Sequence, residues 1–364
     1  MPPSRIAAVE PALPIPTPER AAVNPMRDRQ VAPASFAAES TPIDRVLLDP
    51  HKPTPVESLD LLPGQTITAA EGARAELLIS GGPLRIGMER LRFERIDFVF
   101  ERDAAVQLPP SEPTLLEFSG EEIEFHECTF RIRGGQTPLA TAIRWNDSPA
   151  SGPRSLLPGG RIELTRCRVA GMSAVLAVQR RGELLLDAEH LLHVGPGPLV
   201  RLSEFPTADS SLRLRLTHAT VRGAAVCHGT LSPGVQPGRF TVETRLSVFD
   251  PGSRHAVIEV AGPESAADQL SGFSWEGEGS LLASSAEFLG LDRAGRLQPL
   301  ADSALAVSGL VRSRLEFAGE LSSEPGDSHL LAWQAPLPSG AQPGYQEAGA
   351  MRTAAGTDLS RDRE

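Results

Sequence analysis

One spacing of apolar residues recurs along the chain and limits what it can fold into. In the segment from Ile162 to Val169, apolar side chains stand at positions i, i+2, i+5 and i+7. Strand alternation places each pair on one side of a strand, so the two residues between the pairs must turn a corner that keeps both pairs facing one interior. A helix cannot produce this spacing, whereas a coil of a β-solenoid requires it.

The same template fits several other segments, and a second set of short apolar strands interleaves with them one for one. The template begins at Leu91, Ile123, Ile162, Leu186, Leu214 and Val242. The second set begins at Leu115, Ala142, Val175, Leu199, Ala225 and Val257. Three strands per turn, two of them joined by a tight corner, predict an all-β fold. We expect a right-handed parallel β-helix, a single-stranded solenoid of about nine coils.

The ends of the chain have a different composition from the centre. Residues 1–55 are rich in proline, which removes backbone donors and favours extended segments, so we expect a disordered linker there. Residues 56–333 carry the solenoid pattern. Residues 334–364 are dominated by Pro, Gly, Ala and acidic residues, which predicts a disordered tail.

Composition and charge exclude some classes of partner. The net charge of −11 argues against nucleic acid, whose binding requires a clustered basic surface. The sequence has no apolar run long enough for a transmembrane helix and no signal-like apolar region at its start. Taken literally, this predicts a cytoplasmic protein without a membrane span, and we expect a monomer.

The outward position between i and i+2 is where we look for chemistry. On three successive coils it holds Glu124, Glu163 and Asp187. Coils stack about 5 Å apart, so these carboxylates would form a column that could hold Ca²⁺ or build a sugar-acid site. The alternative, which we favour, is that the column has no binding role and is a row of solvent-exposed carboxylates neutralised by Arg161 and Arg166. No other metal site is expected.

The second set of strands has an outward column as well. Its predicted members are Glu117, Arg144, Ala177, Arg201, Cys227 and Glu259. Glu117 and Arg144 would form an ion pair between coils. Trp145 matches core positions of the neighbouring coils, so we expect it inside and not as a sugar-stacking residue. The inward positions of Cys128 and Cys167 predict stacked thiols and no disulfide.

The template, together with the segments 192–202 and 275–281, resembles uncharacterised bacterial right-handed β-helix proteins that share the fold of the pectate-lyase superfamily. The resemblance covers about residues 60–333 and implies the fold. Known enzymes of that superfamily act on acidic polysaccharides through clustered acidic calcium ligands with a basic residue, or through paired aspartates. Those motifs are not matched residue by residue in this sequence.

We therefore expect a non-catalytic β-helix module that binds or scaffolds a polymer, such as a polysaccharide, or a partner protein, without a cofactor. Its candidate binding residues are Glu124, Glu163, Asp187, Arg144 and Arg166. One alternative is a polysaccharide lyase or glycoside hydrolase in which two carboxyl groups of the Glu124, Glu163 and Asp187 column divide the acid and base roles. Another is an accessory domain of a larger signalling or surface protein.

Overall fold

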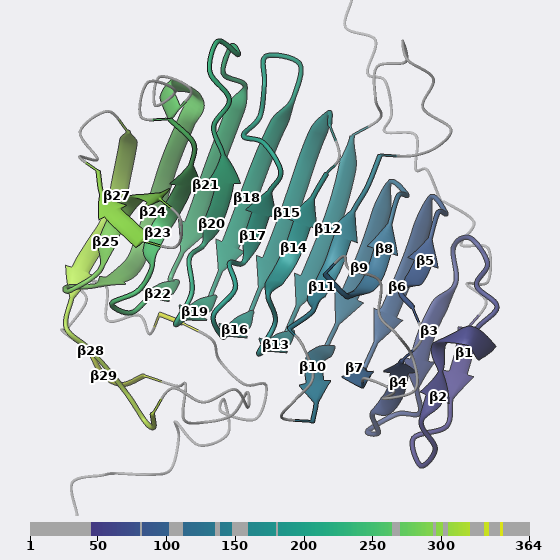
Figure 1. The fold of residues 1–364 in the computed structure, drawn as a ribbon. Coiled ribbons are helices and arrows are strands. Elements are labelled where there is room, and N and C mark those ends of the chain that lie inside the picture. The colour runs from purple at the N-terminus through teal and green to yellow at the C-terminus, as the bar shows by residue number, and fades with distance from the viewer. Residues whose placement is uncertain are drawn as a thin grey trace, which may run out of the picture. The chain divides into compact units, whose positions relative to one another are not determined.

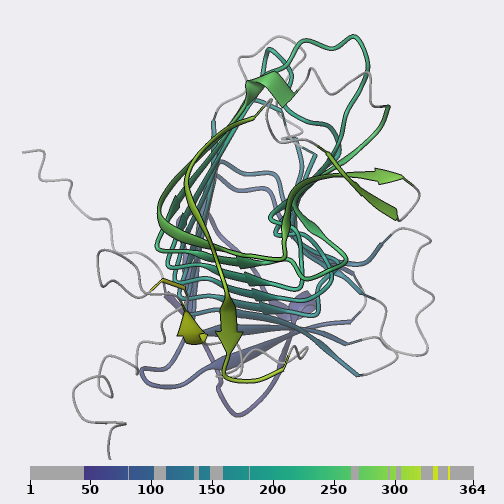
Figure 2. The same ribbon diagram turned by 90° about the vertical axis from the view of Figure 1, so that its left-hand side faces the viewer.

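The protein is an all-β parallel solenoid of about seven turns, with almost no helix. A computed structural model describes residues 45–80, 82–101, 112–134, 139–147, 159–179, 181–263, 270–293, 296–300, 305–320, 331–334 and 343–344. Most of the predicted linker and tail, residues 1–44, 335–342 and 345–364, lie outside the described residues. Figure 1 shows the strands stacked side by side, and Figure 2 looks along the stack.

A complete turn contributes one strand to each of three faces, and incomplete turns at the two ends of the stack add further strands. Face 1 consists of β1 (Arg45–Leu48), β3 (Thr66–Ala69), β6 (Arg90–Glu94), β9 (Glu122–His126), β12 (Gly160–Thr165), β15 (Glu183–Glu189), β18 (Ser211–Thr217), β21 (Arg239–Arg245) and the first halves of β24 (Phe273–Ala283) and β27 (Ala306–Ser313). Face 2 consists of β2 (Thr54–Pro55), β4 (Ala75–Ile79), β7 (Ile96–Glu101), β10 (Thr129–Arg133), β13 (Arg168–Ala170), β16 (Leu192–Val194), β19 (Thr220–Arg222), β22 (Val248–Asp250) and the second halves of β24 and β27.

The third face forms a separate sheet. Face 3 consists of β5 (Leu84–Ile86), β8 (Thr114–Phe118), β11 (Thr141–Trp145), β14 (Ala174–Val178), β17 (Val200–Leu202), β20 (Cys227–Thr230), β23 (Ala256–Ala261), β25 (Glu287–Arg293) and β26 (Arg296–Pro299). A short 3₁₀ helix, η1 (Val56–Ser58), follows β2. β1 and β2 show that regular structure begins at Arg45, before the predicted boundary at residue 56.

The inward columns follow the predicted register. Leu164 pairs with Phe125 on the preceding turn and with Ala188 on the following turn. Phe125, Leu164 and Leu216 are all buried in one continuous core. Stacking of identical positions places aromatic rings over one another, as in Phe93 over Phe125 with ring centroids 5.5 Å apart.

The corner between faces 1 and 2 is built by single residues in the left-handed backbone region. Their φ angles lie between 47° and 56°, and they are Arg95, Glu127, Arg166, His190, His218 and Leu246. This conformation costs a non-glycine residue roughly 1–2 kcal/mol. Hydrogen bonds along the stack offset the cost, since each of these N–H groups donates to the next turn; for example, His190 donates to the Thr217 carbonyl over 2.9 Å.

The solenoid has fewer turns than the nine predicted, because the last segments do not continue the parallel stack. β26 turns back and pairs antiparallel with β25. β28 (Leu315–Phe317) and β29 (Leu331–Gln334) form an antiparallel two-stranded sheet of their own. The segment that follows reaches face 2 again, where Pro343 and Gly344 are buried.

Candidate functional site

The three predicted acids do lie next to one another on the outer surface of face 1. Glu163 pairs in register with Glu124 on one side and with Asp187 on the other. Arginines engage all three: Arg92 lies 3.2 Å from Glu124, and Arg161 lies 2.8 Å from Glu163 and 3.5 Å from Asp187. The column is therefore a network of ion pairs in which the carboxylates are already neutralised.

The two predicted arginines lie elsewhere, so the five residues do not form one site. Arg166 is a corner residue and pairs with Glu127 over 3.4 Å. Arg144 is on face 3, where it pairs with Glu117 over 3.2 Å and donates to the Glu112 carbonyl. The predicted ion pair between Glu117 and Arg144 is confirmed.

A groove crosses face 1 at the beginning of its strands, beside the acidic column. It has a cavity volume of about 1180 Å³ and extends over successive turns from Gly64 to Thr241. The residues two positions before the predicted acidic column form its floor. In register from turn to turn these are Arg90, Glu122, Arg161, Leu185, Arg213 and Thr241. Over the first five of these floor positions, arginine thus recurs at every second turn.

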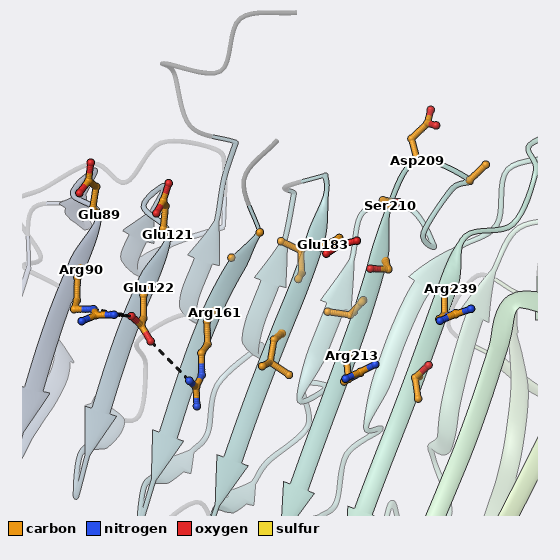
Figure 3. Close-up of a pocket in the computed structure, with 18 of the residues that line it drawn as sticks. Glu89, Arg90, Glu121, Glu122, Arg161, Glu183, Asp209, Ser210, Arg213 and Arg239 are labelled. Carbon is orange, nitrogen blue, oxygen red and sulfur yellow. Dashed lines mark hydrogen bonds and ion pairs between the residues drawn. The ribbon is translucent and has the colours of Figure 1, made fainter. Parts of the chain in front are cut away.

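Ion pairs connect the floor from turn to turn. Glu122 binds Arg90 on the preceding turn and lies 3.8 Å from Arg161 on the following one, as the dashed lines in Figure 3 show. Farther along, Arg213 lies 3.4 Å from Glu243. Each of these guanidinium groups thus has a carboxylate partner, and the floor presents paired donors and acceptors.

Exposed carboxylates follow the rim of the groove. They have no ion-pair partner among the described residues, and they are Glu89, Glu121, Glu183 and Asp209. Figure 3 shows Glu89 and Glu121 projecting above the floor at equivalent places on successive turns. The groove therefore combines an acidic rim with a floor in which arginines alternate with Glu122, Leu185 and Thr241.

Two glycines, Gly159 and Gly160, line the groove at its middle turn. A Cβ atom on Gly160 would lie 2.3 Å from Cζ2 of Trp145, so only glycine fits there. Gly159 stands opposite Glu183 of the following turn and adds no side chain to the groove. Trp145 itself is fully buried, which confirms its predicted core position.

The described residues offer no reactive cluster. No group of three or more His, Cys, Asp or Glu side chains among them could hold a metal ion. His193 is buried inside the solenoid with Nε2 2.7 Å from the Gly197 carbonyl oxygen, and burial lowers its pKa to about 4. All three cysteines are free and buried, as predicted for Cys128 and Cys167.

The outward placement of Cys227 was wrong. Cys227 pairs with Val200 and Ile258 at an inward position, and His228 takes the outward place between Arg201 and Glu259. The shift by one residue buries the apolar thiol and leaves the imidazole at the surface. Burial raises the pKa of the Cys227 thiol strongly, which opposes any role as a nucleophile.

Sequence reasoning missed the groove but contained part of its signal. The floor residues occupy one position of the same template, two residues before the acidic column, and could have been read from the repeat. The contribution of Ala208 to Ser210 depends on the path of a loop, for which the repeat gives no information.

No protein-family model and no curated protein matches the chain. None of the described helices is long and apolar enough to cross a membrane.

Proposed function

We propose that the protein is a non-catalytic binding module whose face 1 groove holds an extended polymer, with a polysaccharide as the ligand class. The observation that carries the proposal is the in-register floor, in which the arginines Arg90, Arg161 and Arg213 recur on every second turn, about 9–10 Å apart along the stack. A ligand that repeats along its own length can make equivalent contacts on several turns at once. Each contact can be weak, since several act together.

The chemistry of the groove fits a hydroxyl-rich ligand. Guanidinium and carboxylate groups both hydrogen-bond to hydroxyl groups, and Ser210, Ser211 and Thr241 add neutral partners. Leu185 provides a small apolar area on the floor between Arg161 and Arg213. An extended segment of a partner protein is the alternative ligand, because its backbone also repeats donors and acceptors.

Catalysis has less support than binding. A lyase or hydrolase built on Glu124, Glu163 and Asp187 needs at least one carboxyl group able to act as acid or base. Arg92 instead pairs with Glu124, and Arg161 pairs with Glu163 and Asp187, so each carboxyl group already has an arginine partner. We further infer a right-handed coil, as in the pectate-lyase superfamily that the sequence resembles, and the module could serve as an accessory domain of a larger protein.

A panel of neutral and acidic polysaccharides, measured by thermal shift with and without Ca²⁺, tests the proposal. A ligand that binds the folded state raises the unfolding temperature by mass action. Exchanging both Arg213 and Arg239 for Ala should abolish the shift. Arg254→Ala, at an exposed arginine outside the groove lining, is the matched control.

Three results would contradict this reading. If no polysaccharide of the panel raises the unfolding temperature, a polysaccharide is excluded as the ligand class. Binding of a partner protein that depends on Arg213 and Arg239 would then identify the alternative ligand. A shift that survives the double exchange places the ligand outside the groove. Release of new reducing ends or unsaturated sugars, lost in Glu163→Gln, would instead establish the enzyme.

A further inference from the structure

A second cavity adjoins the face 1 groove at the corner where strands of face 3 end and strands of face 1 begin. This cavity, the side pocket, has a volume of about 490 Å³, within the range of roughly 300–1,000 Å³ that is typical of small-molecule sites. Its lining comes from the ends of β14 and β17, the beginnings of β15 and β18, and the connections between them. The residues that line both the side pocket and the groove are Leu184, Ser210, Ser211 and Leu212.

The side pocket has a buried apolar wall and an exposed polar edge. Leu202, Phe205 and Leu212 on the apolar wall have exposed fractions of 4%, 5% and 2%. Arg181 and Ser203 lie on the exposed edge. A sugar ring has the same division, because its C–H groups form apolar faces and its hydroxyl groups project around the ring. The lining therefore suits a sugar ring held by apolar contact and a few hydrogen bonds.

Arg181 offers hydrogen-bond donors at the exposed edge. Its backbone N–H donates to Asp147 Oδ1 over 3.0 Å, which ties this corner to the preceding turn. Its guanidinium group has no ion-pair or hydrogen-bond partner among the described residues, whereas Arg90, Arg161 and Arg213 on the groove floor are all paired with carboxylates. Arg181 can therefore donate to a ligand hydroxyl or carboxylate without breaking an existing ion pair.

The wall formed by residues 203–210 is attached to the next turn of the solenoid. The Phe205 N–H donates to the Thr230 carbonyl over 3.0 Å, and the Ala208 N–H donates to the Gln236 carbonyl over 3.1 Å. Backbone hydrogen bonds at two places along this short segment fix its path. The side pocket is therefore preformed, which lowers the entropic cost of binding a ligand there.

We infer that the side pocket holds a side branch of the polysaccharide whose backbone lies in the groove, so that the ligand is a branched polysaccharide. The groove continues along the stack past the shared residues to Thr241, and a backbone that fills it cannot also turn into the side pocket. A sugar attached to that backbone beside β15 and β18 can enter, because the two cavities meet there. The inference rests on the function proposed for the groove and adds the architecture of its ligand.

Four pairs of soluble oligosaccharide fragments test the inference on the full chain. In each pair the second member carries single-sugar branches on the backbone of the first. The pairs are mannan and galactomannan, xylan and arabinoxylan, cellulose and xyloglucan, and homogalacturonan and xylogalacturonan. Titration calorimetry gives the dissociation constants. For at least one pair the branched member should bind about tenfold more tightly, which is the gain expected from about one or two additional hydrogen bonds.

Ser203→Trp should abolish this preference by filling the side pocket, while the linear member keeps its native affinity. Ser203 is exposed, so the larger side chain can be added without displacing the core. Arg181→Ala should reduce the preference by roughly threefold, because it removes the unpaired donors. Ser253→Trp and Arg254→Ala, at exposed residues that line neither cavity, are the matched controls and should keep the native preference.

The outcomes separate this inference from the proposed function. If linear members bind and branched members bind no more tightly, or if the preference survives Ser203→Trp, the side pocket holds no branch, although binding in the groove stands. If Ser203→Trp weakens the linear member as much as the branched one, the backbone itself enters the side pocket and the inference is wrong. If no member of any pair binds, the inference and the proposed ligand class are both contradicted. Far-UV circular dichroism and the melting temperature without ligand show that each variant is folded.

Discussion

His190 and His218 stack face to face on successive turns, with ring centroids 4.9 Å apart and ring planes 2° apart. Both are corner residues, so the backbone repeat imposes the stack. Burial lowers the pKa of each ring, and the charge of His218 lowers that of His190 further. Glu189 opposes the shift, with Oε1 3.7 Å from His190 Nε2, while Arg166 and Arg245 reinforce it. The corner is therefore most stable with both imidazoles neutral.

Stability should fall as the pH is lowered from about 6.5 to 4. The folded-state pKa values of His190, His193 and His218 are lowered, so the unfolded chain binds more protons in this window and acid favours unfolding. For the fully buried His193, a pKa of about 4 against 6.5 corresponds to a loss of about 3 kcal/mol. His193→Gln should reduce the slope of unfolding free energy against pH, measured by urea denaturation.

The exposed His51 provides the control, since His51→Gln should leave that slope unchanged. Equal slopes for the native chain and His193→Gln would show that the buried imidazole does not control the acid response.

Gly160→Ala should destabilise the protein by about 1–3 kcal/mol. The new methyl group would have to displace the fully buried Trp145 ring, and overpacking of a close-packed core is costly. Gly82→Ala is the matched control, because no atom lies within 4 Å of its Cβ position. Thermal denaturation and near-ultraviolet circular dichroism of the tryptophans measure the effect. Comparable melting temperatures for the two variants would show that the core around Trp145 can rearrange to accept the added methyl group.

The repeat predicted the stack well because inward alternation is strict and most residues of the inward columns are apolar. Leu164 could be placed from sequence for that reason. The error at Cys227 arose because the apolar run 224–227 leads into a short strand and is compatible with two registers of inward and outward residues. The contacts of Gly344 with face 2 could not be predicted, since the glycine-rich and alanine-rich sequence around this residue resembles a disordered tail. The part of the groove formed by Ala208 to Ser210 could not be predicted either, because it depends on the path of a loop.

Arg161→Ala should make stability dependent on calcium. Arg161 lies within 4 Å of Glu122, Glu163 and Asp187, and its removal would leave stacked carboxylates without their shared cation. The group is partly exposed, so the loss should be only about 0.5–1 kcal/mol, larger at low ionic strength. Millimolar Ca²⁺ should raise the melting temperature of the variant more than that of the native chain. Equal responses would show that the acids do not act together as a cation site once the arginine is gone.

Arg312→Val should cause the protein to associate end to end. β27 is the last strand of face 1 and face 2, and among the described residues it pairs only with β24, so its outer edge is open. Arg312 stands in register with the buried Leu282, at an inward position, and donates to the Ala286 carbonyl over 2.5 Å.

A charge at an inward position of an edge strand opposes the addition of another strand, as does Pro55 at the opposite end of the stack. Light scattering over a range of protein concentrations should give the monomer mass for the native chain and a rising mass for Arg312→Val. Arg254→Val, in a turn away from both ends, should remain monomeric. A native chain that already associates would show that these residues do not protect the ends, whereas a monomeric Arg312→Val would show that the edge is protected by another feature.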